Sequence, residues 1–277
     1  PPLNHGAADL VKVLVSDDGG QTFRLLRFDV PGAPDPFGFP NVTPGLVTDC
    51  GNPGGGVRQV LHQGPDLGGG RFGLPRYRQA TRLITQPSAA AARGRLFIAL
   101  NSSTSPVFGD PAAGSEIRVL FSLDGGGSWQ VVTAAPANSI DLQHVHPAIA
   151  SDGDGERLQV AYYVQQKDER LRVDLMQAKV KGGRFRTDGV GPLSGVAFDL
   201  IPSNNPFPSA TRPFRTTNYD RVLVACYDIG EYLGVFAKGD AVLSAWGDNR
   251  NPWTSPADSP AAGTHAQADV FFSSGED

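Results

Sequence analysis

Residues suited to acid–base or ligand-binding chemistry are few in this sequence and lie far apart. The chain has 5 histidines, and its 28 acidic residues divide into 23 aspartates and 5 glutamates. Five polar residues precede or begin short apolar segments: Gln86, His144, His146, Glu231 and Tyr232. His144 lies two residues before His146, so both would share one face of an extended segment. If the fold brings these segments together, the five would form a polar site, and the alternative, that they only cap strand ends and bind water, stays open.

Short strands and turns must position these residues, because the composition does not support long helices. Of 277 residues, 34 are glycine and 23 are proline, about one in five, against an average near ~12%. Glu and Lys, which favour helices, are scarce, whereas the abundant Asp suits turns. With 40% hydrophobic residues the chain can bury a core, and no apolar run approaches the ~20 residues of a membrane span. The sequence therefore predicts an all-β protein that does not span a membrane, and its net charge of −4 argues against nonspecific nucleic-acid binding.

Two segments of the sequence repeat the same turn. They read VLVSDDGGQTF over residues 13–23 and VLFSLDGGGSW over residues 119–129. Each contains a Ser-x-Asp-x-Gly-x-(Thr/Ser)-aromatic pattern, in which the carboxylate accepts backbone N–H groups and the glycine takes a positive φ. We expect the aromatic residue to pack between neighbouring sheets. The matching residues are Ser16, Asp18, Gly20, Thr22 and Phe23 in the first segment and Ser122, Asp124, Gly126, Ser128 and Trp129 in the second.

Both segments resemble Asp-boxes, the signature of bacterial neuraminidase repeats in β-propellers. The resemblance implies a β-propeller of four-stranded antiparallel blades, of the sialidase-like superfamily. In that family the Asp-box joins the third and fourth strands of a blade, at the periphery and away from the ligand face. The ten Asp-box residues are therefore expected to be structural. Because Asp-boxes also occur in noncatalytic proteins, the resemblance does not fix the function.

A second repeat supports this fold. Segments at 86–101, 146–163 and 231–246 each have a small-residue strand, a turn containing glycine and an apolar strand, as expected of the two inner strands of a blade. We predict a single propeller domain over 1–277, with about four or five blades present and about six in the complete ring. The blade map assigns third and fourth strands to 10–30, complete blades to 85–135 and 145–187, and two inner strands and a third strand to 230–273.

Three parts of the chain do not follow the blade pattern. Residues 31–84 are rich in Gly and Pro and are expected to be a degenerate blade or a long insertion. Residues 188–222 and 248–266 read as long loops. A propeller closes to protect its sheet edges, and the first segment supplies only half a blade, so we expect further sequence upstream of Pro1.

The last quarter of the chain resembles secreted, sialidase-like propellers more closely. IGEY at 229–232 is similar to an Ile-Gly-Asp-Tyr pattern of that group, and WGDNR at 246–250 is similar to its Trp-x-Asp-x-Arg pattern. A sialidase needs three arginines around the sugar carboxylate and a Tyr nucleophile activated by a Glu. The candidates are Tyr232 and Glu231 as the catalytic pair, with Arg212, Arg215 and Arg250 for the carboxylate.

Two observations count against a sialidase. Glu231 and Tyr232 are adjacent, and adjacent residues of a strand point to opposite faces, so they make a poor nucleophile–base pair unless the segment is a turn. The Arg-Ile-Pro motif that precedes the first Asp-box in sialidases is absent from the sequence.

No cofactor is expected, with calcium as the one alternative. SDGDGE at 151–156 resembles the opening of a calcium loop but lacks its full spacing, and a hairpin turn also accounts for it. Cys50 and Cys226 do not have the spacing of a zinc site, so they either form a disulfide or stay free thiols.

Together with the resemblance, these features predict a noncatalytic, secreted or surface-exposed propeller that binds a carbohydrate or a protein partner. An exo-sialidase-type glycoside hydrolase is the alternative, and a structural module of a larger extracellular assembly is a third hypothesis. The extracytoplasmic setting is implied by the resemblance. The expected ligand-binding residues, at the central face, are Gln86, His144, His146, Arg212, Arg215 and Arg250.

Overall fold

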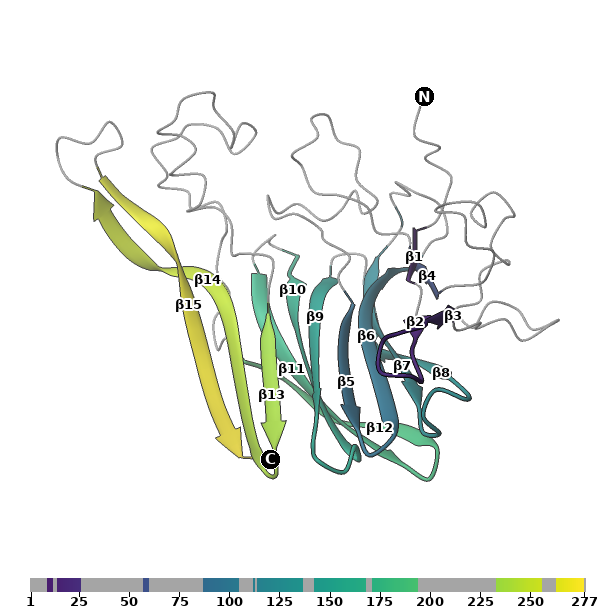
Figure 1. Cartoon of the computed structure of the whole chain (residues 1–277). Coiled ribbons are helices and arrows are strands. Elements are labelled where there is room, and N and C mark those ends of the chain that lie inside the picture. Colours follow the sequence, from purple (N-terminus) through teal and green to yellow (C-terminus); the bar gives the residue numbers. More distant parts are fainter. Residues whose placement is uncertain are drawn as a thin grey trace.

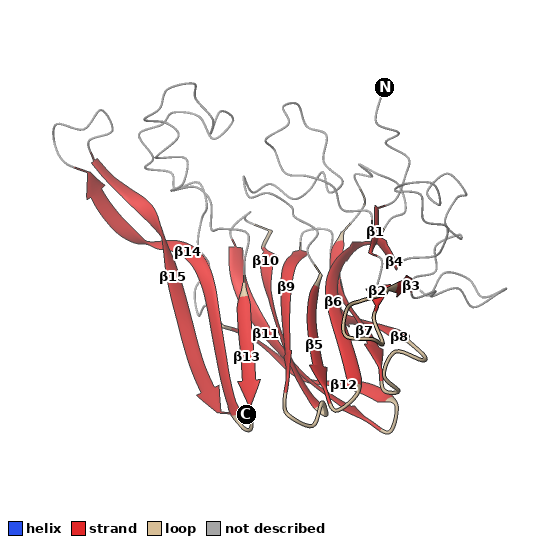
Figure 2. Ribbon diagram, viewed as in Figure 1, coloured by secondary structure: helices blue, strands red, loops and turns tan. Residues whose placement is uncertain are grey.

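The computed structural model is all-β over the residues that it describes, and none of these residues is in a helix (Figure 2). It describes residues 9–11, 14–25, 57–59, 87–104, 112, 114–136, 142–167, 171–193, 233–255 and 263–276. Within these ranges no helix is long and apolar enough to cross a membrane. Cys50 and Cys226 lie outside the described residues, so their pairing stays open.

Two four-stranded antiparallel units form the centre of the fold, and in each unit every strand pairs with the next along the chain (Figure 1). The first sheet contains β5 (Ser88–Ala92), β6 (Arg95–Ser103), β7 (Ser115–Ser122) and β8 (Gln130–Ala135). The second sheet contains β9 (Gln143–Ser151), β10 (Arg157–Gln165), β11 (Leu171–Lys181) and β12 (Arg184–Pro192). A parallel bridge between Ser115 and Gln143 joins the two units at one end.

A third sheet follows, made of β13 (Gly234–Lys238), β14 (Ala241–Ser255) and β15 (Gly263–Glu276). The expectation that 248–266 is a long loop is wrong, because β14 and β15 continue as a paired hairpin through most of it. Pro252, which cannot donate to a strand ladder, lies within β14. Among the described strands, β13 reaches only as far as Ala245, so beyond that point β14 is paired on one edge alone and a proline is tolerated on the other.

Two short strand pairs lie toward the N-terminus. β2 (Leu14–Val15) pairs with β3 (Arg24–Leu25) across the first Asp-box-like turn. β1 (Asp9–Val11) pairs with β4 (Val57–Gln59), the one described segment within 31–84. Whether 31–84 is a degenerate blade or an insertion therefore stays a prediction.

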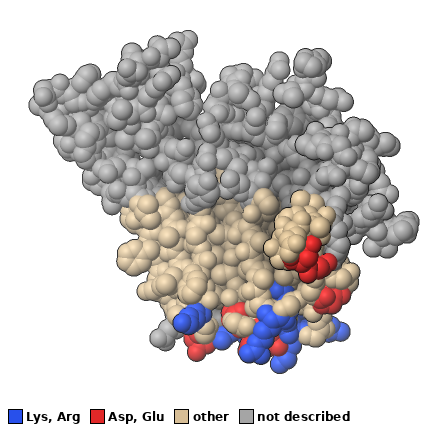
Figure 3. All heavy atoms as spheres, in the orientation of Figure 1, with Lys and Arg blue, Asp and Glu red and all other residues tan. Residues whose placement is uncertain are grey.

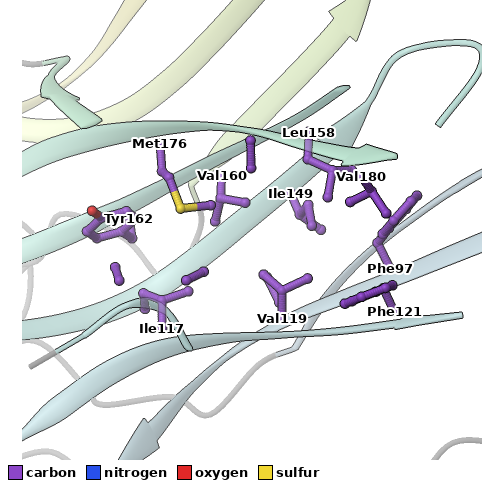
Figure 4. Close-up of a cluster of buried hydrophobic side chains, with 14 of the residues drawn as sticks. Phe97, Ile117, Val119, Phe121, Ile149, Leu158, Val160, Tyr162, Met176 and Val180 are labelled. Atoms are coloured by element: carbon purple, nitrogen blue, oxygen red, sulfur yellow. The ribbon is translucent and has the colours of Figure 1, made fainter. Parts of the chain in front are cut away.

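The main core lies between the first and second sheets (Figure 4). Strand alternation explains its composition, since every second residue of each facing strand points into it. It is built from aliphatic and aromatic side chains of β6, β7, β9, β10 and β11. Its largest members are Phe97, Ile117, Phe121, Leu158, Tyr162 and Met176.

The other face of the second sheet is covered by the third sheet. The Tyr163 hydroxyl of β10 donates to the Gly247 carbonyl of β14 and accepts from the Gly247 N–H, both at 3.0 Å. Trp246 is buried on the same strand. The first strands of the three sheets, β5, β9 and β13, lie side by side, with β9 in the middle (Figure 1).

Arginine side chains link each sheet to the next, near the turn between its first two strands. Arg95, the first residue of β6, donates to the carbonyls of Gly155 and Val180 in the second sheet at 3.1 and 3.3 Å. Arg157, the first residue of β10, donates to the carboxylate of Asp240 in the third sheet at 2.9 Å. The two arginines hold equivalent positions in successive sheets, so the same type of tie is used twice.

Strands lie in the regions assigned to them within 85–135, 145–187 and 230–273. The expected loop over 188–222 is wrong at its start, because β12 continues to Pro192. The described sheets form an open row and do not close into a ring, so the propeller and its number of blades stay predictions (Figure 1).

Candidate functional site

Of the predicted site residues, only His144 and His146 are described with their side chains, and both lie on β9. Arg250 is described in its backbone alone, on β14 at the irregular pairing between Asp248 and Asn251. The remaining five lie outside the described residues and keep the status of predictions. They are Gln86, Arg212, Arg215, Glu231 and Tyr232.

His144 is a buried residue that packs between sheets. Its Nδ1 lies 3.2 Å from the carbonyl oxygen of Ala135, which can only accept, so Nδ1 carries the proton. Its ring centroid lies 5.3 Å from that of Tyr162. Burial lowers the pKa of His144, while the hydrogen bond to Ala135 and the charge of Asp174 oppose this shift. The neutral imidazole is therefore the favoured form.

Tyr162 and Asp174 extend this polar end of the core. Tyr162 of β10 is paired with Asp174 of β11 across the strands. Arg172 grips the Asp174 carboxylate with two hydrogen bonds, at 2.7 and 2.9 Å. Burial, and then the charge of Asp174, raise the pKa of Tyr162. Its phenol therefore stays protonated at neutral pH, which is the opposite of what an activated nucleophile needs.

His146 does not share a face with His144, because β9 is not regularly extended there. Val145 pairs with Tyr163 and Ala148 with Ala161, so two residues of β9 oppose one residue of β10. This is a β-bulge, and His146 adopts a φ of 51° within it. The His146 ring packs edge-on against Tyr163 at 6.3 Å, on the face that meets the third sheet.

Further polar residues that the sequence analysis missed lie at the same strand ends. Ser115 donates to the carbonyl of His144 at 2.6 Å, and Asn101 and Gln143 are fully buried nearby on β6 and β9. On the opposite face of β7, Arg118 donates to Glu116 at 2.6 Å. The sequence signal was present, since each of these polar residues interrupts or ends an otherwise apolar strand.

The two Asp-box-like turns have the same hydrogen bonds. In the second turn, Ser122 donates to Asp124 Oδ1 at 2.7 Å, and the Ser128 hydroxyl donates to Asp124 Oδ2 at 2.6 Å. The corresponding bonds to Asp18 in the first turn are 2.8 and 2.6 Å long. The hydroxyl of Thr22 or Ser128 is the largest cause that lowers the pKa of each aspartate to about 2. Both carboxylates are engaged within their own turns.

Charged side chains gather at the end of the sheets where the inner hairpins turn (Figure 3). Arg93 pairs with Asp154 at 3.0 Å, and Arg95 with Glu156 at 3.5 Å. Asp152, in the segment that resembles a calcium loop, accepts the N–H of Glu156 at 2.9 Å. These contacts lie within or between turns. Among the described residues no group of three His, Cys, Asp or Glu side chains is placed to hold a metal ion.

The described parts of the site therefore combine buried, paired polar groups with packed aromatic rings. His144, Tyr162 and Asp174 sit at the end of the core, whereas His146 and Tyr163 sit on the opposite face of the same sheet. These residues form a packed, buried layer beside the strand ends. It does not bring together a nucleophile and a base among the described residues.

Comparisons with known proteins give weak structural similarity. No family model matches the sequence, and no curated protein matches it. Trypanosoma rangeli sialidase in complex with sialic acid is 12% identical over 69% of this chain and 30% of that chain, with a TM-score of 0.32. A mutant of the same sialidase displaying trans-sialidase activity is 11% identical over 61% of this chain and 29% of that chain, with a TM-score of 0.29. The chain spans less than a third of the length of these sialidase chains.

Proposed function

We propose that this chain is a noncatalytic β-propeller unit of the Asp-box type, which binds a carbohydrate or a protein partner in an extracytoplasmic setting. The observation that carries the proposal is the repeated turn. Its five corresponding hydrogen bonds agree within 0.1 Å between the two copies. Two copies of one hydrogen-bond network, each built on the same Ser-x-Asp-x-Gly-x-(Thr/Ser) pattern, favour a repeating β architecture over a chance turn.

The stacking of the sheets supports the same proposal. Three sheets lie in a row with their first strands β5, β9 and β13 adjacent, and a small-residue strand, SAAAA, begins the first sheet. Small side chains let inner strands approach closely, as a crowded centre requires. The ligand face would then be at the strand ends where His144 and Asp174 lie, opposite the charged hairpin turns.

A binding role is favoured over catalysis by the protonation of the described polar groups. His144 is held neutral by burial, and the raised pKa of Tyr162 keeps its phenol protonated. Arg172 holds Asp174 with one hydrogen bond to each carboxylate oxygen. Such groups shape and rigidify a surface, whereas a glycosidase needs a free acid and an activated nucleophile.

Glycan binding and sialoside turnover of the same protein, each measured with and without calcium, test this proposal. We expect binding to a glycan array or capture of a defined protein partner, lost in His146→Ala and Glu231→Gln and retained in the exposed control Lys181→Ala. We expect no cleavage of a fluorogenic sialoside at any pH. Cleavage that disappears in Tyr232→Phe would overturn the noncatalytic role in favour of the exo-sialidase hypothesis. The absence of both binding and cleavage would favour a purely structural module.

A further inference from the structure

One face of the third sheet is not covered by any of the described elements. The residues of this open face are Phe236 on β13, Leu243 on β14, and Val270 and Phe272 on β15. Strand pairing places Phe236 beside Leu243 on the same face. Val270 and Phe272 are each 80% exposed. Large apolar side chains gathered on one sheet face mark an interaction surface.

The open face carries a cross-strand residue pair that has an equivalent in each of the other two sheets, on the face that meets the next sheet. In each sheet, an alanine four residues after the start of the second strand is paired with an apolar residue of the third strand. In the first sheet both partners are fully buried against the second sheet. In the second sheet the alanine is fully buried beneath the third, and its partner Leu175 is partly buried. In the third sheet the apolar partner, Phe272, is exposed. The pairs are Ala99 with Val119, Ala161 with Leu175, and Ala245 with Phe272. The open face is therefore the next position in an established series of sheet-on-sheet interfaces.

The β2–β3 hairpin, residues 14–25, exposes apolar side chains whose equivalents in the first sheet pack in a buried cluster. Aligning its turn with that between β7 and β8 makes Leu14 equivalent to Leu120 and Phe23 equivalent to Trp129. Leu120 is fully buried, and Trp129 packs against its cluster. Leu14 and Phe23 are instead 56% and 63% exposed.

The exposed residues of the hairpin face the opposite way along the row. Leu120 lies between Val119 and Phe121, whose side chains point toward the second sheet, so Leu120 points away from it. By equivalence, Leu14 and Phe23 belong to the face that receives a preceding sheet. The open face of the third sheet is the face that receives a following one. The two surfaces are matching halves of one type of interface.

We propose that the open face of the third sheet docks the β2–β3 hairpin of a second copy of this chain. Within one copy the hairpin and the third sheet lie at opposite ends of the row, and both surfaces are exposed (Figure 1). A reciprocal pair buries both surfaces of both copies, with Phe23 of each against Phe272 of the other. Because each contact joins two different surfaces, the pair closes only when both copies supply both.

The mass of the 277-residue protein in solution tests this pairing, by light scattering over a concentration series. We expect a mass of twice 29.3 kDa, falling to 29.3 kDa in Phe272→Glu and in Phe23→Glu. The control Val190→Glu changes an exposed apolar residue of β12, outside both surfaces, and is expected to stay a dimer. Val270→Ser is a milder second variant of the open face, and circular dichroism checks that each variant is folded.

Mixing the two monomeric variants distinguishes this pairing from others. A Phe272→Glu copy keeps its hairpin and a Phe23→Glu copy keeps its open face, so their mixture regains one of the two contacts. We expect the mixture to form a heterodimer with weaker affinity than the wild type. A monomeric wild-type protein at every concentration overturns the proposal. So does a dimer that Phe23→Glu leaves intact, which would show the open face pairing with itself, and so does a mixture that stays monomeric.

Discussion

His144 and His146 contact tyrosines on opposite faces of the second sheet, although only Val145 separates them. The ring of His144 meets Tyr162 and that of His146 meets Tyr163, and these tyrosines are neighbours on β10. The bulge in β9 inverts the usual alternation at this point. The two imidazoles therefore pack in different sheet interfaces.

The burial of His144 predicts a dependence of stability on pH. Because its pKa is lowered in the folded protein, the unfolded chain binds the extra proton, and stability falls as pH decreases below about 6.5. His144→Gln removes this contribution. Urea unfolding at a series of pH values should show a shallower loss of stability on the acid side for the variant. An unchanged slope would contradict the role of this histidine.

The turn aspartates predict a second dependence, at much lower pH. The pKa of Asp124 is lowered to about 2, so its contribution is present above its ordinary pKa of 3.8 and is lost as pH falls through about 2. Asp124→Asn should destabilise the protein at neutral pH, and its difference from the wild type should shrink between these two values. Thermal melts across this range measure it. Asp154→Asn, which removes an exposed ion pair with Arg93, is the control at neutral pH and should destabilise the protein less there than Asp124→Asn.

The arginine ties predict a difference between two neighbouring arginines. Arg95 is part-buried and donates to two carbonyls of the second sheet, whereas Arg93 forms an exposed ion pair. Arg95→Ala should cost about 1–3 kcal/mol of unfolding free energy, because buried carbonyls lose their donor. Arg93→Ala should cost less than about 1 kcal/mol. Equal losses in chemical denaturation would show that the ties do not couple the sheets.

The two hydrogen bonds between Tyr163 and Gly247 attach the third sheet to the second, and their contribution can be measured. Its hydroxyl both donates to and accepts from Gly247, so Tyr163→Phe leaves two buried backbone groups without this partner. We expect a loss of about 1–3 kcal/mol, with amide exchange in β14 increasing more than in β6. Uniform acceleration across both strands would contradict a local role.

Gly155 tests the close approach of the first two inner turns. It has a φ of 69°, and an added Cβ would lie 3.0 Å from Arg95 Cδ and 3.2 Å from the Ala92 carbonyl. Gly182 has a φ of 59° with nothing within 4 Å. Both alanine variants carry backbone strain, but Gly155→Ala should lower the melting temperature further because it also displaces Arg95.

The strands and the turn chemistry were readable from the sequence because they depend on local patterns. The spacing of Ser122, Asp124 and Ser128 defines a closed set of hydrogen bonds whatever surrounds it. The inner hairpins were readable for the same reason, since Gly94 and Gly239 take the positive φ that their turns need.

The candidate site was less readable because it depends on contacts between distant strands. The bulge at His146 had one local signal, Pro147, which lacks the N–H that a regular ladder uses. No local sequence signal indicated the importance of Asp174, because its neighbours His144 and Tyr162 come from two other strands. Glu231, Tyr232, Arg212 and Arg215 lie outside the described residues, and Arg250 is described in its backbone alone, so their expected roles remain predictions.

The row of sheets has a consequence for how the protein comes apart. Each sheet is tied to its immediate neighbour, by Arg95 on one side of the second sheet and by Arg157 on the other. Cooperativity then passes from one sheet to the next, as along a chain of coupled units. In a single copy, the third sheet is tied to a described neighbour on one face only, so we expect local unfolding to start there. The second sheet is packed on both faces, so its amide protons should exchange most slowly.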